Sequence, residues 1–320
     1  MKNRLFCDRL REVNCHIKEF NVTGLQRRIK SPILILKLLI ETLFHNYRRI
    51  IVSTHDSLAF RIINILGKIG IIEKTIYWVI GGGVSKRIER DELSSRFLNR
   101  LYKIVVEDNS IKDHLNLMGY LNVITVPNFK PIMTIRDVDK YTNRFVFVSR
   151  ITPLKGCDII ISAVKELNRK GLLFDMDFYG YIEDGYPFEE YINNIPNVHY
   201  RGVLSLKSQL DYEYLSKYTA LVLPTFYPNE GFPGTLIDGF IAGLPIITSR
   251  WRYNENIIDD MKQGWLLDIQ NSEALAEVME GILKGNYDLL EMSNYCAKKA
   301  KEYDIHNVLA ETLLSQLSLV

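Results

Sequence analysis

Cysteine and long apolar runs are both scarce in this sequence. No run of about 18 apolar residues is present, so no segment is expected to span a membrane. The first residues, MKNRLFCDRLREV, lack the apolar core of a secretory signal. The few cysteines have no metal-ligand spacing and suit a reducing cytosol better than a disulfide framework. They are Cys7, Cys15, Cys157 and Cys296. We therefore expect a cytoplasmic protein.

An excess of one charge is also missing. The chain has 40 Lys and Arg against 38 Asp and Glu, a formal net charge of +2, which argues against general nucleic-acid binding. The 320 residues are 47% hydrophobic and 24% charged, as in an ordinary globular protein with room for two domains. Strand-like apolar runs alternate with helical patterns throughout, which predicts an α/β protein with parallel sheets.

The stretch Thr219–Arg250 is the most informative part of the chain. It reads TALVLPTFYPNEGFPGTLIDGFIAGLPIITSR: an apolar run, a loop rich in proline and glycine, a short helical segment and a second apolar run. Pro233 suits the first helical turn, and Gly243 followed by Pro245 suits the helix end. This pattern predicts a βαβ unit of a parallel sheet, whose loop and helix N-terminus are a potential anion site.

Two acids bracket this loop. Glu230 lies within it, and Asp238 lies about two turns into the helix at ~3.6 residues per turn. Chance acids also occur in such loops of many α/β proteins. The run EGFPGTLIDGFIAGLPII, however, resembles the signature of the retaining glycosyltransferases of family 4, which have the GT-B fold. There, two acids with seven residues between them frame the sugar-nucleotide donor. Most members have glutamate at both places, and the aspartate here resembles a branch of bacterial capsule and exopolysaccharide transferases.

A second match follows the predicted strand Arg144–Ser149. Arg150 offers a planar fork for phosphate oxygens and Lys155 offers a compact charge, although two solvated loop cations are the simpler interpretation. The spacing of Arg150, Lys155 and Gly156 resembles the diphosphate clamp of the family. Because the carboxyl ends of parallel strands share one edge of a sheet, we expect these cations to meet Glu230 at one site.

The resemblance implies roles for the surrounding residues. Glu230 would hold hydroxyls of the donor sugar and Asp238 would hold the ribose of a UDP- or GDP-sugar. The backbone of Val203 would read the base. The loop and helix residues that would line the donor site are Gly231, Phe232, Pro233, Gly234 and Thr235. The reaction would retain the anomeric configuration of a hexosyl donor, without a metal or a further cofactor, and the two domains would close over the donor.

A metal-binding DxD is present only formally. Asp175 and Asp177 fall within a predicted strand, which places both carboxylates on one face near the strand start. The metal-binding motif of the other large glycosyltransferase fold lies on a loop at a strand end, so we expect no metal site here.

Two motifs follow strands of the first half of the chain. His55 comes directly after the predicted strand Arg49–Thr54, where ligands contact α/β sheets. A lone histidine is more often structural, but in the resembling family a histidine here lines the cleft near the acceptor. Gly81–Gly83 follows the strand Lys74–Ile80. A turn is the default interpretation, yet the capsule enzymes have a two-glycine loop at a similar place, here Gly82 and Gly83.

The segment Ser31–Phe44 is predicted to be a helix, with Ser31 as its N-cap and Pro32 at its first position. It is apolar almost all round. One interpretation is a patch that rests on anionic lipid, on the inner face of the plasma membrane. The other, which we favour, is a buried helix that covers the sheet. The flanking bases are Arg27, Arg28, Lys30, Arg48 and Arg49.

The predicted architecture is GT-B, with two Rossmann-like domains that face each other across a cleft. Residues 1–135 would form a shortened acceptor-side domain and residues 142–303 the donor domain, with the hinge motif at Val126–Phe129. Residues 304–320 would return to the first domain as a helix over Ile305–Leu317. The opening strand and glycine-rich loop of the family are not recognisable. A strand within Val13–Val22 and a helix over Arg90–Leu101 are further expectations.

The predicted activity is transfer of the donor sugar to an acceptor hydroxyl, on a glycan or a lipid-linked glycan. Two alternatives stay open. A nucleotide-sugar epimerase of the same fold would need several acid-base residues, and only His55 is a candidate. A non-catalytic subunit that supports a partner transferase agrees with the short first domain, but not with the intact set of Arg150, Lys155 and Glu230.

Overall fold

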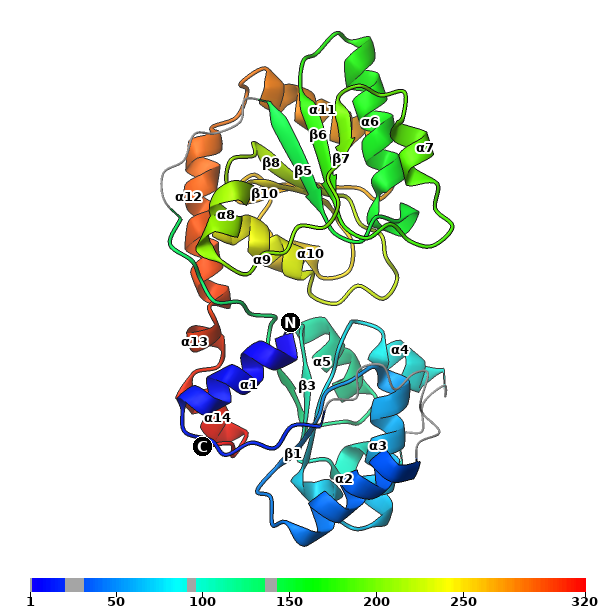
Figure 1. Cartoon of the computed structure of the whole chain (residues 1–320), viewed down its shortest axis with the longest axis vertical. Helices are drawn as coiled ribbons and strands as arrows, with labels where there is room; N and C mark the ends of the chain where they lie inside the picture. The colour runs from blue at the N-terminus through cyan, green and yellow to red at the C-terminus, as the bar shows by residue number, and fades with distance from the viewer. Residues whose placement is uncertain (1, 21–31, 91–95, 136–142) are drawn as a thin grey trace. The chain divides into compact units, whose positions relative to one another are not determined.

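The computed structural model describes residues 2–20, 32–90, 96–135 and 143–320, without the side chains of residues 32–36 and 39. The chain forms two compact α/β units (Figure 1). Unit 1 comprises residues 1–127 and 308–320, and unit 2 comprises residues 128–307. The boundaries fall at Pro127 and Asn307 rather than at residues 135 and 303, because the segment after Pro127 pairs with the end of unit 2.

The described part of unit 1 contains a four-stranded parallel sheet in the order β1-β2-β3-β4. Tyr77 of β2 is fully buried, and its ring meets that of Phe60 edge-on at 5.6 Å. The strands are Ile50–Val52, Thr75–Trp78, Lys103–Val106 and Val123–Thr125. The helices are α1 (Lys2–Glu12), α2 (Pro32–Phe44), α3 (Asp56–Lys68), α4 (Val84–Glu89), α5 (Asn109–Leu117) and α14 (Glu311–Gln316).

Helix α1 is a feature that the sequence pattern does not indicate. It buries only Phe6 and Leu10, and Phe6 packs on Trp78 with ring centroids 4.5 Å apart. Two such positions are too few to give a helical period. The strand expected within Val13–Val22 is not present in its described part, residues 13–20; residues 21 and 22 lie outside the described ranges.

Two predicted helices of unit 1 have different bounds in the structure. The helix expected at Arg90–Leu101 begins earlier, as α4 directly after Gly83; residues 91–95 lie outside the described ranges, and only a 3-10 turn at Leu98–Arg100 follows. The helix expected at Ile305–Leu317 is two short helices, α13 (Ile305–Val308) and α14. Leu309 is buried where the chain breaks between them, so the return segment bends to place an apolar side chain in the core.

Unit 2 is built on a six-stranded parallel sheet in the order β10-β9-β8-β5-β6-β7. The strand order reverses between β5 and β8, which makes their carboxyl ends the switch point of the sheet. The strands are β5 (Arg144–Val148), β6 (Asp175–Tyr179), β7 (Val198–Tyr200), β8 (Ala220–Leu223), β9 (Ile246–Ser249) and β10 (Gly264–Leu267).

Helices cover both faces of this sheet. Helix α6 packs beside α11 on one face, and α9 packs beside α8 and α12 on the other (Figure 1). The helices are α6 (Cys157–Arg169), α7 (Phe188–Ile192), α8 (Gln209–Leu215), α9 (Gly234–Ile241), α10 (Asn254–Ile257), α11 (Ser272–Leu283), α12 (Leu289–Ala300) and α13. The βαβ unit predicted for Thr219–Arg250 is β8-α9-β9, with Pro233 as the N-cap residue, one position before the helix.

Helix α2 forms where it is predicted, but its carboxyl half is not buried. The side chains of Ile40, Leu43 and Phe44 are exposed, so the interpretation as a fully buried helix does not hold there. Ser31 and the bases Arg27, Arg28 and Lys30 lie outside the described residues. None of the described helices is both long and apolar enough to cross a bilayer.

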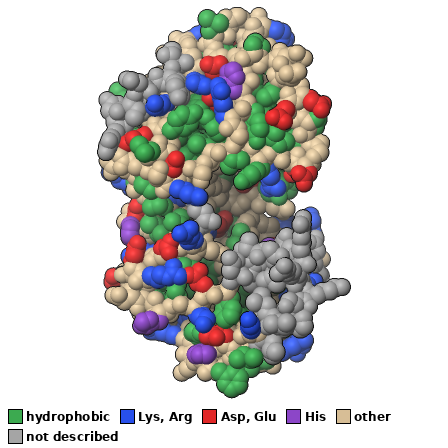
Figure 2. Space-filling view, viewed as in Figure 1, with side chains coloured by type: hydrophobic (Ala, Val, Ile, Leu, Met, Phe, Trp, Pro, Cys, Tyr) green, Lys and Arg blue, Asp and Glu red, His purple; other side chains and the backbone are tan. Residues whose placement is uncertain are grey.

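The surface has no region dominated by one charge on the face drawn in Figure 2. Lysine, arginine, aspartate and glutamate side chains are interspersed there. This agrees with the balanced composition.

Candidate functional site

The candidate site lies at the switch point of unit 2, where two loops touch. The loop after β5 contains a 3-10 turn at Pro153–Lys155, and the loop after β8 begins at Pro224. Gly156 has φ +83°, and a β-carbon at this position would overlap the carbonyl oxygen of Pro224. The amide of Phe226 donates to the carbonyl of Leu154 at 3.0 Å. Only glycine at position 156 allows the two loops to approach this closely.

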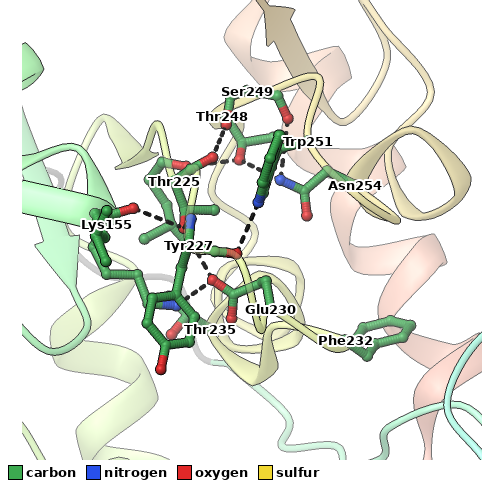
Figure 3. Close-up of polar contacts among 12 residues, drawn as sticks. Lys155, Thr225, Tyr227, Glu230, Phe232, Thr235, Thr248, Ser249, Trp251 and Asn254 are labelled. Carbon is green, nitrogen blue, oxygen red and sulfur yellow. Dashed lines mark hydrogen bonds and ion pairs between the residues drawn. The ribbon is translucent and has the colours of Figure 1, made fainter. Parts of the chain in front are cut away.

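Lys155 and Glu230 meet at the centre of this contact (Figure 3). The Lys155 ammonium donates to Glu230 Oε2, and the Thr225 hydroxyl donates to the same oxygen at 2.9 Å. Lys155 is 7% exposed and Glu230 is 8% exposed. A buried pair of this kind is held only because each charge compensates the other. The structure therefore brings together two residues that the sequence places 75 positions apart.

Tyr227 lies between the two predicted cations. Its ring centroid is 5.3 Å from Arg150 Cζ and 5.4 Å from Lys155 Nζ. Arg150 is half exposed and faces Glu183 at 3.9 Å. Trp251 donates its indole N–H to the Tyr227 carbonyl at 2.8 Å. Trp251 thus stabilises the loop that contains the tyrosine.

Asp238 lies in α9 and has a separate set of partners. It is 5% exposed, and its Oδ1 accepts from the Lys130 ammonium and, at 2.6 Å, from the Tyr212 hydroxyl. Burial and the charge of Asp238 raise the pKa of Tyr212, so this hydroxyl stays protonated. The sequence pattern indicates neither partner, because Lys130 lies in no helix or strand and Tyr212 is one of several aromatic residues in its helix.

Of the loop residues between the two acids, some form the start of α9 and one, Phe232, packs elsewhere in unit 2. Gly234 and Thr235 begin α9, whose first N–H groups have no partner within the helix. The Thr235 hydroxyl donates to the Val148 carbonyl at the end of β5, at 2.9 Å. Pro233 is the N-cap. The Phe232 ring points away from the Lys155–Glu230 pair (Figure 3) and meets the Tyr303 ring at 5.0 Å.

Two further predicted positions lie near these loops in the chain. Gly231 separates Glu230 from Phe232 and is buried. Val203 follows β7 and Gly202, at the same carboxyl edge of the sheet, and is 48% exposed. The neighbouring strands are joined there, since the Gly180 amide donates to the Gly202 carbonyl at 2.8 Å. Val203 is therefore open to a ligand at this edge.

The predicted residues of unit 1 follow two neighbouring strands, β1 and β2. His55 is the N-cap residue of α3, and its buried Nε2 has no hydrogen-bond partner among the residues that the structure describes. The adjacent Asp56 is buried and accepts from the Tyr77 hydroxyl at 2.9 Å and from Arg87 at 3.1 Å. Gly82 and Gly83 lead into α4, the helix that carries Arg87. The histidine and the glycines can be named from the sequence, whereas the buried aspartate and its partners cannot.

The formal DxD is part of a structural network. Asp177 is fully buried and accepts from Arg144 at 2.9 Å, Arg201 at 3.1 Å and Tyr218 at 2.6 Å. Asp175 faces His199 at 3.0 Å. In the described parts of the chain, no group of three or more His, Cys, Asp or Glu side chains has a metal-binding arrangement.

Comparisons with known proteins show that this chain is similar to glycosyltransferases. The family described as "Glycosyl transferases group 1" matches residues 129–303, more than half of the chain. The amylovoran biosynthesis glycosyltransferase AmsK of Erwinia amylovora is 24% identical over 163 residues, which cover 49% of this chain and 40% of AmsK. The chain thus spans less than half the length of that relative.

Solved structures share the fold at low identity. A glycosyltransferase from Rickettsia africae has a TM-score of 0.70 and 18% identity, covering 98% of this chain and 87% of its own. Anabaena HepE, solved with UDP and glucose, has a TM-score of 0.69 and 14% identity, covering 94% of this chain and 84% of its own. The chain has two α/β units with parallel sheets, as in the GT-B fold, and the family matches most of unit 2. The chain therefore belongs to the group 1 glycosyl transferases.

Proposed function

We propose that this chain transfers a sugar from a nucleoside-diphosphate sugar to an acceptor hydroxyl, with the donor bound at the switch point of unit 2. One observation carries the proposal: Lys155 and Glu230, from two loops far apart in sequence, form a buried pair next to Arg150 and the start of α9. Cations and unpaired helix N–H groups at one sheet edge suit a diphosphate.

The mechanism follows from the charge that develops as the glycosidic bond breaks. The leaving diphosphate gains negative charge, so the site needs positive charge in place rather than a strong base. Lys155, Arg150 and the first N–H groups of α9 supply it. Glu230 accepts hydrogen bonds from hydroxyls of the donor sugar and so fixes the position of the anomeric carbon. Asp238 accepts hydrogen bonds from the ribose hydroxyls. We propose a hexosyl donor carried by UDP or GDP, and retention of its anomeric configuration.

The acceptor is proposed to be a glycan of a surface polysaccharide, linked to a lipid. The name of AmsK, an amylovoran biosynthesis glycosyltransferase, supports this class. In unit 1, His55 and the loop at Gly82 and Gly83 lie at carboxyl ends of parallel strands, where ligands of α/β sheets bind. They are the proposed acceptor-side contacts.

The function is tested by calorimetric titration with a panel of UDP- and GDP-sugars, followed by product analysis. We expect one sugar nucleotide to bind and its sugar to be transferred with retention, seen in the product NMR spectrum as H1–H2 and one-bond C1–H1 couplings of the same anomer as the donor. Both results should persist in EDTA. Loss of activity in EDTA with rescue by a divalent cation would contradict the metal-independent mechanism, and binding without transfer to any lipid-linked glycan would favour a non-catalytic subunit.

A peripheral contact with anionic lipid is proposed for α2. Ile40, Leu43 and Phe44 are spaced i, i+3, i+4 and all are exposed, so they share one helix face. Lys37 and Arg48 are exposed nearby in sequence. An apolar face with basic neighbours suits the surface of a phosphatidylglycerol bilayer.

Replacing Leu43 and Phe44 with aspartate should weaken binding to phosphatidylglycerol vesicles at least about tenfold, because burial of each side chain contributes about 1.5–3 kcal/mol. Flotation or co-sedimentation measures this binding. Leu173→Asp, at a leucine of unit 2 that is 86% exposed, is the matched control and should leave binding unchanged. Equal binding of the α2 variant and the wild type would remove the membrane contact from the proposal.

A further inference from the structure

The two oxygens of the Asp238 carboxylate have different surroundings. The Lys130 ammonium and the Tyr212 hydroxyl both donate to Oδ1. Oδ2 receives no hydrogen bond from any residue in the described ranges, and it is not fully buried. A carboxylate oxygen has room for about two donors. One oxygen is therefore fully used by the protein, and the other is left to accept from a ligand.

Lys130 is itself held from both sides. Its amide donates to the Tyr303 carbonyl at 3.1 Å, and its carbonyl accepts from the Ile305 amide at 3.0 Å. Its side chain lies next to the start of α9. A β-carbon added to Gly234 would be 3.8 Å from Lys130 Nζ. The main chain of Lys130 is fixed by pairing and its side chain is buried, so its ammonium has little freedom and fixes the aspartate in turn.

The charge of Lys130 has a second consequence for an anionic ligand. A bare carboxylate in the second turn of α9 would repel a diphosphate bound at the start of that helix. Lys130 compensates this charge at close range while leaving Oδ2 available. Aspartate is one methylene shorter than glutamate, so its orientation must be set by its partners if one oxygen is to reach a hydroxyl.

We propose that Lys130 is a positioning residue of the donor site: together with Tyr212 it holds Oδ1 of Asp238 and directs Oδ2 to the ribose hydroxyls of the nucleoside diphosphate. This inference rests on the proposed function, since it assumes a nucleotide at this edge of unit 2. On this proposal, Lys130, which lies outside the donor loop, determines how strongly the site prefers a ribose to a sugar without the 2′ and 3′ hydroxyls.

The test compares UDP and GDP with their 2′,3′-dideoxy analogues by calorimetry. For the nucleotide that binds, the wild type should prefer the ribose form at least about tenfold, since hydrogen bonds to a charged group are stronger than those between neutral groups. Lys130→Met should lose most of this preference: its affinity for both forms falls, because the uncompensated Asp238 repels the diphosphate, but its affinity for the ribose form falls further. Lys130→Arg should keep part of the preference, and Tyr212→Phe should lose part of it.

The possible failures are distinct. If the wild type binds neither UDP nor GDP, the proposed function itself fails. If Lys130→Met keeps the full preference, or loses affinity equally for both forms, Lys130 acts as a structural or phosphate-binding cation and the inference is overturned. Thermal unfolding checks that the variants fold. If Lys130→Met does not, Tyr212→Phe decides alone, and an unchanged ribose preference in it overturns the inference.

Discussion

Replacing Lys155 with alanine is expected to lower kcat/KM for sugar transfer about 10²–10³-fold, the loss typical when one group that stabilises developing charge is removed. Lys155 is the buried cation of the site, and no other described lysine or arginine pairs with Glu230. Steady-state rates with the donor identified by calorimetry measure the effect. Lys165→Ala, at an exposed lysine of α6, is the matched control and should change the rate little.

The loss at Lys155 has two possible physical sources, and a double variant isolates the part that comes from lost stability. Lys155→Ala leaves Glu230 as a buried charge without its compensating cation, which is destabilising by itself. Adding Glu230→Gln removes that charge. If Lys155 stabilises the leaving diphosphate, the double variant should regain thermal stability but not activity. Recovery of activity in the double variant would contradict a role for the lysine in catalysis.

Gly156→Ala is expected to destabilise unit 2 by about 2–5 kcal/mol, the sum of a left-handed backbone without glycine and an overpacked contact. The added methyl group would overlap the Pro224 carbonyl and push apart the two loops that bring Lys155 to Glu230. Activity should fall with stability. The midpoint of urea unfolding, followed by circular dichroism, measures the change.

A second glycine provides the control for this prediction. Gly171 has φ +74°, close to the +83° of Gly156, but a β-carbon there would meet nothing within 4 Å. Gly171→Ala should therefore show the backbone cost alone. A Gly156→Ala variant that is no less stable than Gly171→Ala would mean that the contact between the loops is not tight in solution.

The sequence predicts the centre of the site well for a physical reason. The βαβ unit is encoded locally, by an apolar run, a glycine-rich loop and a helix start within Thr219–Arg250. Parallel strands then bring the ends of β5 and β8 to one edge, so Lys155 and Glu230 meet as a consequence of topology. Residue spacing and one rule about sheets are enough for this inference.

The partners of Asp238 could not be predicted in the same way. Lys130 and Asp238 are 108 positions apart, and Lys130 lies in no helix or strand whose period could place it. Its position depends on pairing with the segment at Tyr303–Ile305, a tertiary contact between two irregular stretches. Helix α1 is missed for a related reason, because its two buried residues acquire meaning only once Trp78 is in place.

The return of the chain to unit 1 determines how the protein can be divided. Arg9 donates to the Leu309 carbonyl, Cys15 to the Leu319 carbonyl, and the Tyr102 and Ser318 hydroxyls lie 2.8 Å apart. Unit 2 is one uninterrupted stretch that two cuts can excise. Unit 1 is encoded in two separate pieces of the gene, so its independent expression requires a graft that joins Pro127 directly to Val308.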